Sequence, residues 1–196
     1  RLGIEEILDM SGRATTILKL KNNEFLASSM LCDNKGFLII ATNIGRVLKI
    51  RITDEFLPIM GKLAQGSTII KMFPQETIIG AIYTSKNVKR DLIIITKKGL
   101  VIKNSINNIR ESAKGSLGSI GVKFKDSRNY QDRVVQISDA KQLLGIITSK
   151  GRTGRVSGTD LEKLNYKILN KNLIQLEKDE EVQTAVPLID NNNFFD

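Results

Sequence analysis

The chain has 196 residues, of which 41% are hydrophobic and 26% are charged, so it is long and apolar enough to bury a core. It contains no histidine and one cysteine, Cys32, which excludes an internal disulfide framework, histidine-based catalytic triads and the usual zinc sites. No apolar run reaches the roughly 18 residues of a membrane-spanning helix. We expect no metal, no cofactor and no membrane partner, and we expect Cys32 to be a small buried side chain beside a strand.

The charge is distributed unevenly along the chain. Thirty Lys and Arg residues against 21 Asp and Glu residues give a net charge of +9. Residues 177–196 hold six acidic residues and one basic residue, which leaves 29 basic against 15 acidic residues over residues 1–176. A body this basic favours a polyanionic partner, most commonly nucleic acid, and the alternative is a basic surface without such a partner.

The first strong element is a β-hairpin over residues 37–52, after a short acidic connector near the start. Residues 37–42 are apolar up to the final Thr42, as in a strand buried on both faces, whereas residues 47–52 alternate between two faces, one apolar and one largely basic. Gly45 between them supplies the positive φ of a tight turn. Two further strands are predicted over residues 67–73 and 77–83, joined by Pro74-Gln75-Glu76.

The same pattern returns along the chain. The turn glycines Gly45, Gly99 and Gly151 are separated by 54 and 52 residues. A second marker recurs at a constant spacing of 52, as ILKL (17–20), IIKM (69–72), GVKF (121–124) and LIQL (173–176). Two markers that keep step define an array of units of about 52 residues with roughly four strands each, which is typical of propeller-like blades.

The sequence therefore predicts an all-β fold of about four blade units. Three units are predicted to be complete, and the two ends of the chain supply a partial or composite fourth. We expect a single domain over residues 1–188, followed by a polar, acidic tail over residues 189–196. The tail is interpreted as a frayed terminus or linker, or as a segment that competes with DNA for the basic surface.

The hairpins IIATNIGRVLKI and IIITKKGLVIKN, with the connectors GRAT (12–15), GKLAQG (61–66) and AKGSLG (113–118), resemble the blades of a known family. It is the C-terminal domain of the A-type subunit of type IIA DNA topoisomerases, which include DNA gyrase and topoisomerase IV. The resemblance implies a β-pinwheel, in which neighbouring blades exchange strands. It also implies a non-catalytic domain that binds and bends or wraps duplex DNA, presenting a segment to the cleavage core for strand passage and control of supercoiling.

The resemblance implies partners and a location as well. The partners would be duplex DNA, the rest of the A-type subunit, and the ATPase B-type subunit, in the cytoplasm at the nucleoid or in an organelle of bacterial descent. A QRRGGKG-type box, which distinguishes gyrase, does not occur in the sequence. Either that box lies upstream of Arg1, or the chain is a topoisomerase IV-like subunit that bends DNA without wrapping it.

Cations recur at equivalent places in the repeat. They stand four positions after each turn glycine, one position after two of them, and in the connectors. A charged track of this kind suits phosphates, which repeat along a duplex and are held without reading bases, although each single cation alone reads as a solvated strand end. The candidate DNA contacts are Arg13, Arg46, Lys49, Arg51, Lys62, Lys97, Lys98, Lys103, Lys114, Arg152 and Arg155.

An enzymatic site within this chain is not expected. The stretch GRTGRVSG lacks the order of a phosphate-binding loop, and the family's cleaving tyrosine belongs to the N-terminal core. Tyr83, Tyr130 and Tyr166 are interpreted as packing or surface residues. A propeller-type protein–protein interaction module is the alternative, although aromatic anchors are scarce. Binding of single-stranded RNA is disfavoured for the same scarcity.

Overall fold

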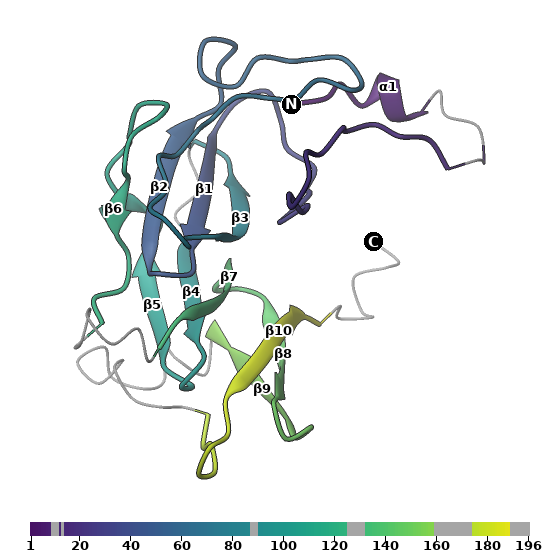
Figure 1. Cartoon of the computed structure of the whole chain (residues 1–196). Helices are drawn as coiled ribbons and strands as arrows, with labels where there is room; N and C mark the ends of the chain where they lie inside the picture. The colour runs from purple at the N-terminus through teal and green to yellow at the C-terminus, as the bar shows by residue number, and fades with distance from the viewer. Residues whose placement is uncertain (9–11, 13, 87–89, 125–131, 159–173, 189–196) are drawn as a thin grey trace, which may run out of the picture.

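The computed structural model describes residues 1–8, 12, 14–86, 90–124, 132–158 and 174–188, and it is all-β, as predicted (Figure 1). The predicted tail over residues 189–196, Arg13, Tyr130 and Tyr166 lie outside the described residues. A four-residue helix, α1 (Glu5–Leu8), lies in the acidic connector, and a 3-10 turn, η1 (Ile106–Asn108), directly follows residue Ser105.

Three antiparallel sheets follow one another along the chain. The first has the order β3 (Ile78–Thr84), β1 (Phe37–Thr42), β2 (Arg46–Arg51) and β6 (Ser119–Ile120). The second has the order β5 (Val101–Ser105), β4 (Asp91–Thr96) and β7 (Val134–Asp139). The third has the order β10 (Val182–Pro187), β8 (Leu143–Thr148) and β9 (Thr153–Ser157).

Each sheet is built on the same plan, which confirms the repeat. A hairpin is followed in the chain by a third strand that pairs with the hairpin's first strand. The turn glycines Gly45, Gly99 and Gly151 have φ of 85°, 78° and 75°, as the tight turns require. The strand predicted over residues 67–73 is wrong, because this segment forms one isolated bridge, Ile70 with Ser116.

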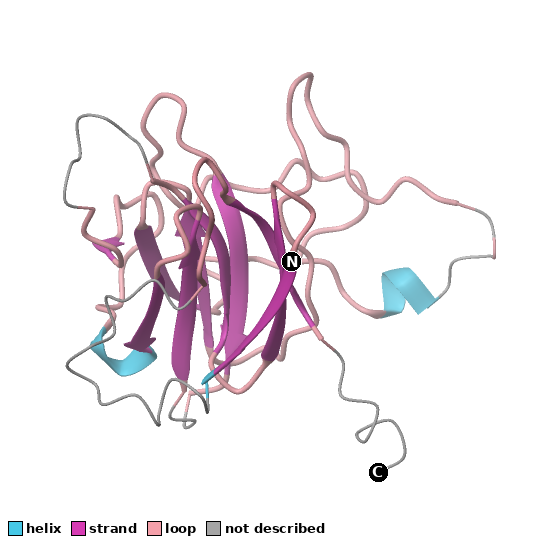
Figure 2. Cartoon of the chain, turned by 90° about the horizontal axis from the view of Figure 1, so that it is seen from below, coloured by secondary structure: helices cyan, strands magenta, loops and turns pink. Residues whose placement is uncertain are grey.

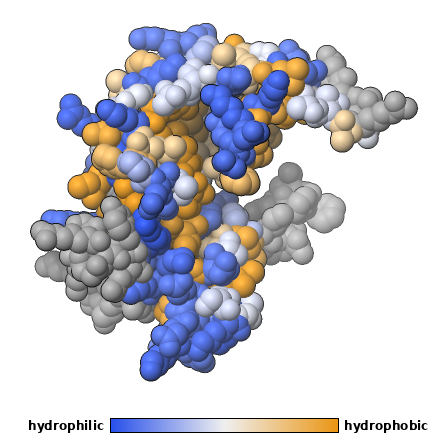
Figure 3. All heavy atoms as spheres, viewed as in Figure 1, coloured by the Kyte–Doolittle hydropathy of each residue, from blue (hydrophilic) through white to orange (hydrophobic). Residues whose placement is uncertain are grey.

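The core lies between the sheets, because the first strand of each hairpin is apolar on both faces. Ile39 of β1 packs with Leu92 and Ile94 between the first and second sheets, whereas Ile40 packs on the opposite face of the first sheet. Ile93 of β4 packs in turn against the third sheet. Apolar side chains accordingly gather along the middle of the molecule (Figure 3), and the strands run side by side with the loops at their ends (Figure 2).

Backbone segments of one unit pair with the sheet of a neighbouring unit, as expected for a β-pinwheel. Strand β6 follows β5 in the chain but pairs with β2 of the first sheet. The carbonyl oxygen of Gly45 accepts hydrogen bonds from the amides of Gly121 and Val122, each at 2.9 Å. The second marker of the repeat therefore serves to close the hairpin turn of an earlier unit.

The connectors also follow the repeat. The Leu63 amide donates to the Ile17 carbonyl at 3.0 Å, and 52 residues later the Gly115 amide donates to the Ile69 carbonyl at 2.6 Å. Leu63 has a φ of 66° and Gly115 one of 76°, so both connectors contain the same left-handed residue. The marker segments thus connect one unit to the next instead of forming a fourth regular strand in each sheet.

The described ends of the chain do not build a fourth sheet. Strand β10 joins the third sheet, and residues 14–35 pair with no strand among the described residues. Cys32 is exposed, contrary to expectation, because the segment that carries it joins no sheet. The three predicted units correspond to the three sheets, and within the part of the chain that the structure describes the two ends do not combine into a composite fourth.

Candidate nucleic-acid interface

The sequence-predicted cations lie in different environments. Arg46 and Lys103 are buried, with 9% and 8% of their surfaces exposed. Several others lie on the surface in ion pairs, and Arg155 is exposed without an ion pair among the described residues. A shared position in the repeat does not give a shared exposure.

Arg46 binds the buried carboxylate of Glu76 through its guanidinium, an arrangement that we call the arginine clamp. Its guanidinium donates to both carboxylate oxygens of Glu76 and to the carbonyls of Leu117 and Lys71, and it lies 4.5 Å from the centre of the Phe73 ring. Burial alone would raise the pKa of Glu76, but hydrogen bonds from the Arg46 and Thr42 side chains and the Phe73 amide, with the Arg46 charge, lower it overall. This arginine holds the hairpin turn of the first unit to two later segments.

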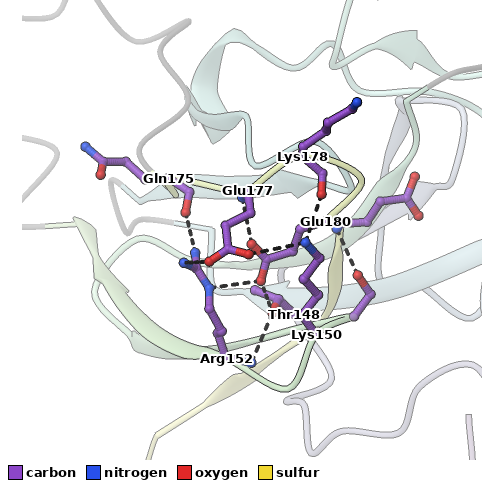
Figure 4. Close-up of polar contacts among 9 residues, drawn as sticks. Thr148, Lys150, Arg152, Gln175, Glu177, Lys178 and Glu180 are labelled. Atoms are coloured by element: carbon purple, nitrogen blue, oxygen red, sulfur yellow. Dashed lines mark hydrogen bonds and ion pairs between the residues drawn. The ribbon is translucent and has the colours of Figure 1, made fainter.

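Arg152 repeats the clamp in the third sheet (Figure 4). Its Nε donates to Glu180 at 3.0 Å, while its other nitrogens donate to Glu177 at 3.1 Å and to the Gln175 carbonyl at 2.6 Å. The pKa of Glu180 is lowered, first by the Glu177 amide and then by the Thr148 hydroxyl and Arg152. The Arg152 side chain is 45% exposed, so this clamp faces solvent on one side.

The middle unit lacks the clamp, because Leu100 stands where the other two have arginine. The middle unit keeps an acidic residue at the place equivalent to Glu76 and Glu180, but this residue has a different role. Asp132 accepts the amide hydrogens of Lys98 at 3.0 Å and of Arg133 at 2.9 Å. The break in the arginine pattern at Leu100 therefore coincides with a carboxylate held by backbone amides.

The cations four positions after each glycine do share a register. Lys49, Lys103 and Arg155 pair with Ile39, Ile93 and Gly145 on the first strands of their hairpins. Their environments differ. Lys49 donates to the Ile106 carbonyl at 3.2 Å, and Lys103 forms an ion pair with Asp91 at 3.1 Å with only 2% of its side chain exposed. Of the three, only Arg155 is exposed.

Several surface candidates pair with acidic residues in exposed ion pairs, which contribute only about 0–1 kcal/mol each. Arg51 donates twice to Glu111, at 2.8 and 2.9 Å, and this pairing raises the pKa of Arg51 and lowers that of Glu111. The other pairs are Lys62 with Glu6 at 3.4 Å and Lys97 with Glu181 at 2.8 Å. Lys98 is exposed and Lys114 is half-buried.

Sequence reasoning missed a more regular set of cations. The third residue of the marker is Lys19, Lys71 and Lys123, all exposed and none in an ion pair among the described residues. Lys71 lies beside the connector, since its amide donates to the Ser116 carbonyl at 3.0 Å. The constant spacing of 52 residues between these lysines is the signal in the sequence that points to them.

Two of these lysines lie at the outer edge of the first sheet. Residues 110–123 cross this edge. There, the backbone of Glu111 forms an isolated β-bridge with that of Lys49, and β6 pairs with the start of β2. We call this edge the first-sheet rim and define it by four cations at or beside the crossing segment: Lys71, Arg110, Lys114 and Lys123.

Comparisons with known proteins agree with this architecture. A family model described as DNA gyrase C-terminal domain, beta-propeller, matches residues 36–85 and 90–137. The A subunit of DNA gyrase from Helicobacter pylori strain J99 is 23% identical over 143 residues, which are 73% of this chain and 17% of that protein. The chain therefore spans less than a fifth of that relative's length.

Two solved structures share the fold. The crystal structure of the C-terminal domain of DNA topoisomerase IV has a TM-score of 0.73 at 16% identity and covers 87% of this chain and 52% of its own. The DNA gyrase A C-terminal domain has a TM-score of 0.63 at 19% identity, covering 87% and 56%. Within the described residues, no helix has the length and hydropathy needed to cross a membrane. The chain belongs to the DNA gyrase C-terminal domain family, the β-propeller domains of the A-type subunits in DNA gyrase and topoisomerase IV.

Proposed function

We propose that this domain binds duplex DNA through its phosphates and bends it along the outer edges of the sheets. The observation that carries the proposal is the recurrence of an exposed lysine every 52 residues, at Lys19, Lys71 and Lys123, on blades of this family. Phosphates repeat along a duplex at a constant spacing, so a repeated cation can hold several of them without reading the bases.

The first-sheet rim is the proposed centre of this contact. It gathers four cations, with Arg51 beside them in an exposed pair with Glu111 that a phosphate can replace. Arg155, Lys62, Lys97, Lys98 and Arg152 would extend the contact on the other units. Arg46 and Lys103 are set aside, because their buried charges are already engaged by Glu76 and Asp91.

The domain would serve a larger enzyme. We propose that it presents the bent DNA to the cleavage core on the rest of the A-type subunit, in an ATP-dependent topoisomerase completed by a B-type subunit in the cytoplasm. The cleaving tyrosine would lie outside these residues, and the domain itself would act without a cofactor. Bending a duplex by 40–90° costs roughly 1–6 kcal/mol, which added phosphate contacts would offset.

The test is the salt dependence of binding. A fluorescent duplex is titrated with the domain at several salt concentrations, and the variant Lys71→Gln/Lys123→Gln is compared with Lys35→Gln/Lys141→Gln. The control removes the same charge from exposed lysines near the strand ends opposite the hairpin turns. The rim variant is expected to flatten the slope of log K against log salt by about 1.8, at about 0.9 per lost phosphate contact.

Equal slopes for the two variants would contradict the rim assignment. No binding of any duplex at moderate salt would contradict DNA binding itself and would favour the protein–protein interaction module. Ligation of nicked plasmid in the presence of the domain distinguishes the two enzyme types. A one-directional shift in linking number indicates chiral wrapping, as in gyrase, whereas binding without a shift indicates bending alone.

A further inference from the structure

A four-residue turn precedes strand β3 of the first sheet and strand β10 of the third sheet. In the first, the Glu76 carboxylate accepts the Phe73 amide at 2.8 Å, and in the third the Glu180 carboxylate accepts the Glu177 amide at 2.8 Å. The backbone also closes, with the amide of each glutamate donating to the carbonyl three residues earlier at 3.1 and 3.2 Å. The turn presents its carboxylate to the arginine of the hairpin beside it.

Within the described residues, the same turn is also found near the start of the chain. The Glu24 carboxylate accepts the Lys21 amide at 2.8 Å, and the Glu24 amide donates to the Lys21 carbonyl at 3.1 Å. Asn23 has a φ of 66°, like Gln75 at 61° and Asp179 at 59° in the other two turns. The three turns lie 52 and 104 residues apart, so residues 21–24 belong to the repeat.

Among the described residues, no arginine completes this turn. Glu76 is held by Arg46 and Glu180 by Arg152, and both carboxylates have no exposed side-chain surface. Glu24 is exposed, and no arginine reaches it among the described residues. A carboxylate is therefore oriented for a guanidinium that no hairpin in the described part of the chain supplies.

The segment after this turn also has, among the described residues, no partner strand like those of its equivalents in the first and third sheets. Strands β3 and β10 begin at equivalent places and pair with β1 and β8, whereas residues 26–32 pair with nothing in the part of the chain that the structure describes. Phe25, Leu26 and Leu31 are 87%, 65% and 82% exposed. Cys32 is exposed at the position where the first sheet buries Thr84 to 1%.

We infer that residues 17–32 form a docking edge for one additional β-hairpin of this repeat, carrying the sequence Thr-x-x-Gly-Arg. The arginine would pair with Glu24, and the first strand of the hairpin would pair with residues 26–32 and cover their apolar side chains. This inference does not depend on DNA binding. The chain's own hairpins of this type are already engaged, Arg46 with Glu76 and Arg152 with Glu180.

The test uses a synthetic peptide with the sequence of residues 36–52, carrying solubilising lysines at both ends, against the isotopically labelled domain. NMR shifts are expected at residues 21–32, with the Lys21 amide among them. A peptide with leucine in place of its arginine, as at Leu100 in the middle unit, is expected to bind about tenfold more weakly or worse. The domain variant Glu24→Gln is expected to lose a similar factor, whereas the control Glu55→Gln, another exposed glutamate, leaves binding unchanged.

Three results would overturn the inference. The peptide does not bind, or it binds equally well after Arg→Leu and after Glu24→Gln, or its shifts fall on residues 78–84 because it invades the first sheet. Concentration-dependent self-association without peptide, abolished by Glu24→Gln, would make a second copy of the chain the occupant instead. Glu24 is exposed, so its substitution should leave the fold intact and the result interpretable.

Discussion

Replacing Arg46 by leucine removes the most buried arginine of the repeat and reproduces the residue of the middle unit. Leucine retains apolar contact with Phe73, but Glu76 is left with no guanidinium although its side chain has no exposed surface. The Leu117 and Lys71 carbonyls also lose their donors. The variant therefore isolates the cost of an uncompensated buried charge.

The expected cost follows from that burial. Removing one partner of a buried ion pair destabilises a protein by about 3–5 kcal/mol. With a urea m-value of about 2 kcal/mol/M, the unfolding midpoint should fall by about 1.5–2.5 M. The double variant Arg46→Leu/Glu76→Gln should recover a large part of this loss, because the unpaired charge is then gone.

Urea unfolding followed by far-UV circular dichroism measures this, since the chain has no tryptophan for fluorescence. Arg155→Leu is the matched control: it removes an exposed cation from the hairpin of the third sheet and should change stability by less than about 0.5 kcal/mol. A loss below about 1 kcal/mol for Arg46→Leu, or no recovery in the double variant, would refute the clamp.

Two further predictions concern the turn and the acid that it holds. Gly45→Ala and Gly151→Ala both place a side chain at positive φ, but a Cβ at Gly45 would lie 2.8 Å from the Val122 carbonyl oxygen whereas Gly151 has open space. Thermal unfolding should therefore show a cost of about 1–2 kcal/mol for Gly151→Ala and a clearly larger one for Gly45→Ala; equal costs would contradict the turn closure. The lowered pKa of Glu76 means that its ionised form stabilises the fold fully above the ordinary glutamate value of 4.5 and loses that effect as the pH falls through the lowered pKa. The stability difference between wild type and Glu76→Gln should shrink in acid, and a constant difference from pH 7 to 3 would show that Glu76 is not held ionised.

The repeat and its hairpins were predictable because local chemistry determines them. The apolar run of residues 37–42, the alternation after it and the glycine between them leave few alternatives to a tight hairpin. Residues 67–73 have the same apolar character, yet they connect sheets. Their hydrogen bonds go to the connector near Ser116, more than 40 residues away, and no local pattern reveals such a partner.

The candidate cations show the same limit. Sequence spacing placed Lys49, Lys103 and Arg155 at one register position, and the strand pairing agrees. Whether a cation is exposed depends on acidic residues elsewhere in the chain. The buried Lys103 is paired with Asp91, and the buried Arg46 is paired with Glu76, which lies 30 residues further along the chain. Glu76 and Glu180 are themselves two repeats apart, so the spacing of the acidic residues could have indicated which arginines are paired.

The closure of the Gly45 turn by Gly121 and Val122 affects how the domain can be assembled. In a linear array of repeats, each unit contacts only its neighbours, and a break between units can leave folded parts. Here the carbonyl of Gly45 finds its donors 76 residues downstream, beyond the whole hairpin of the second sheet. The sheet that contains Gly45 therefore cannot be completed until the chain has been synthesised past Val122, and a cleavage between the second hairpin and Gly121 would damage that sheet.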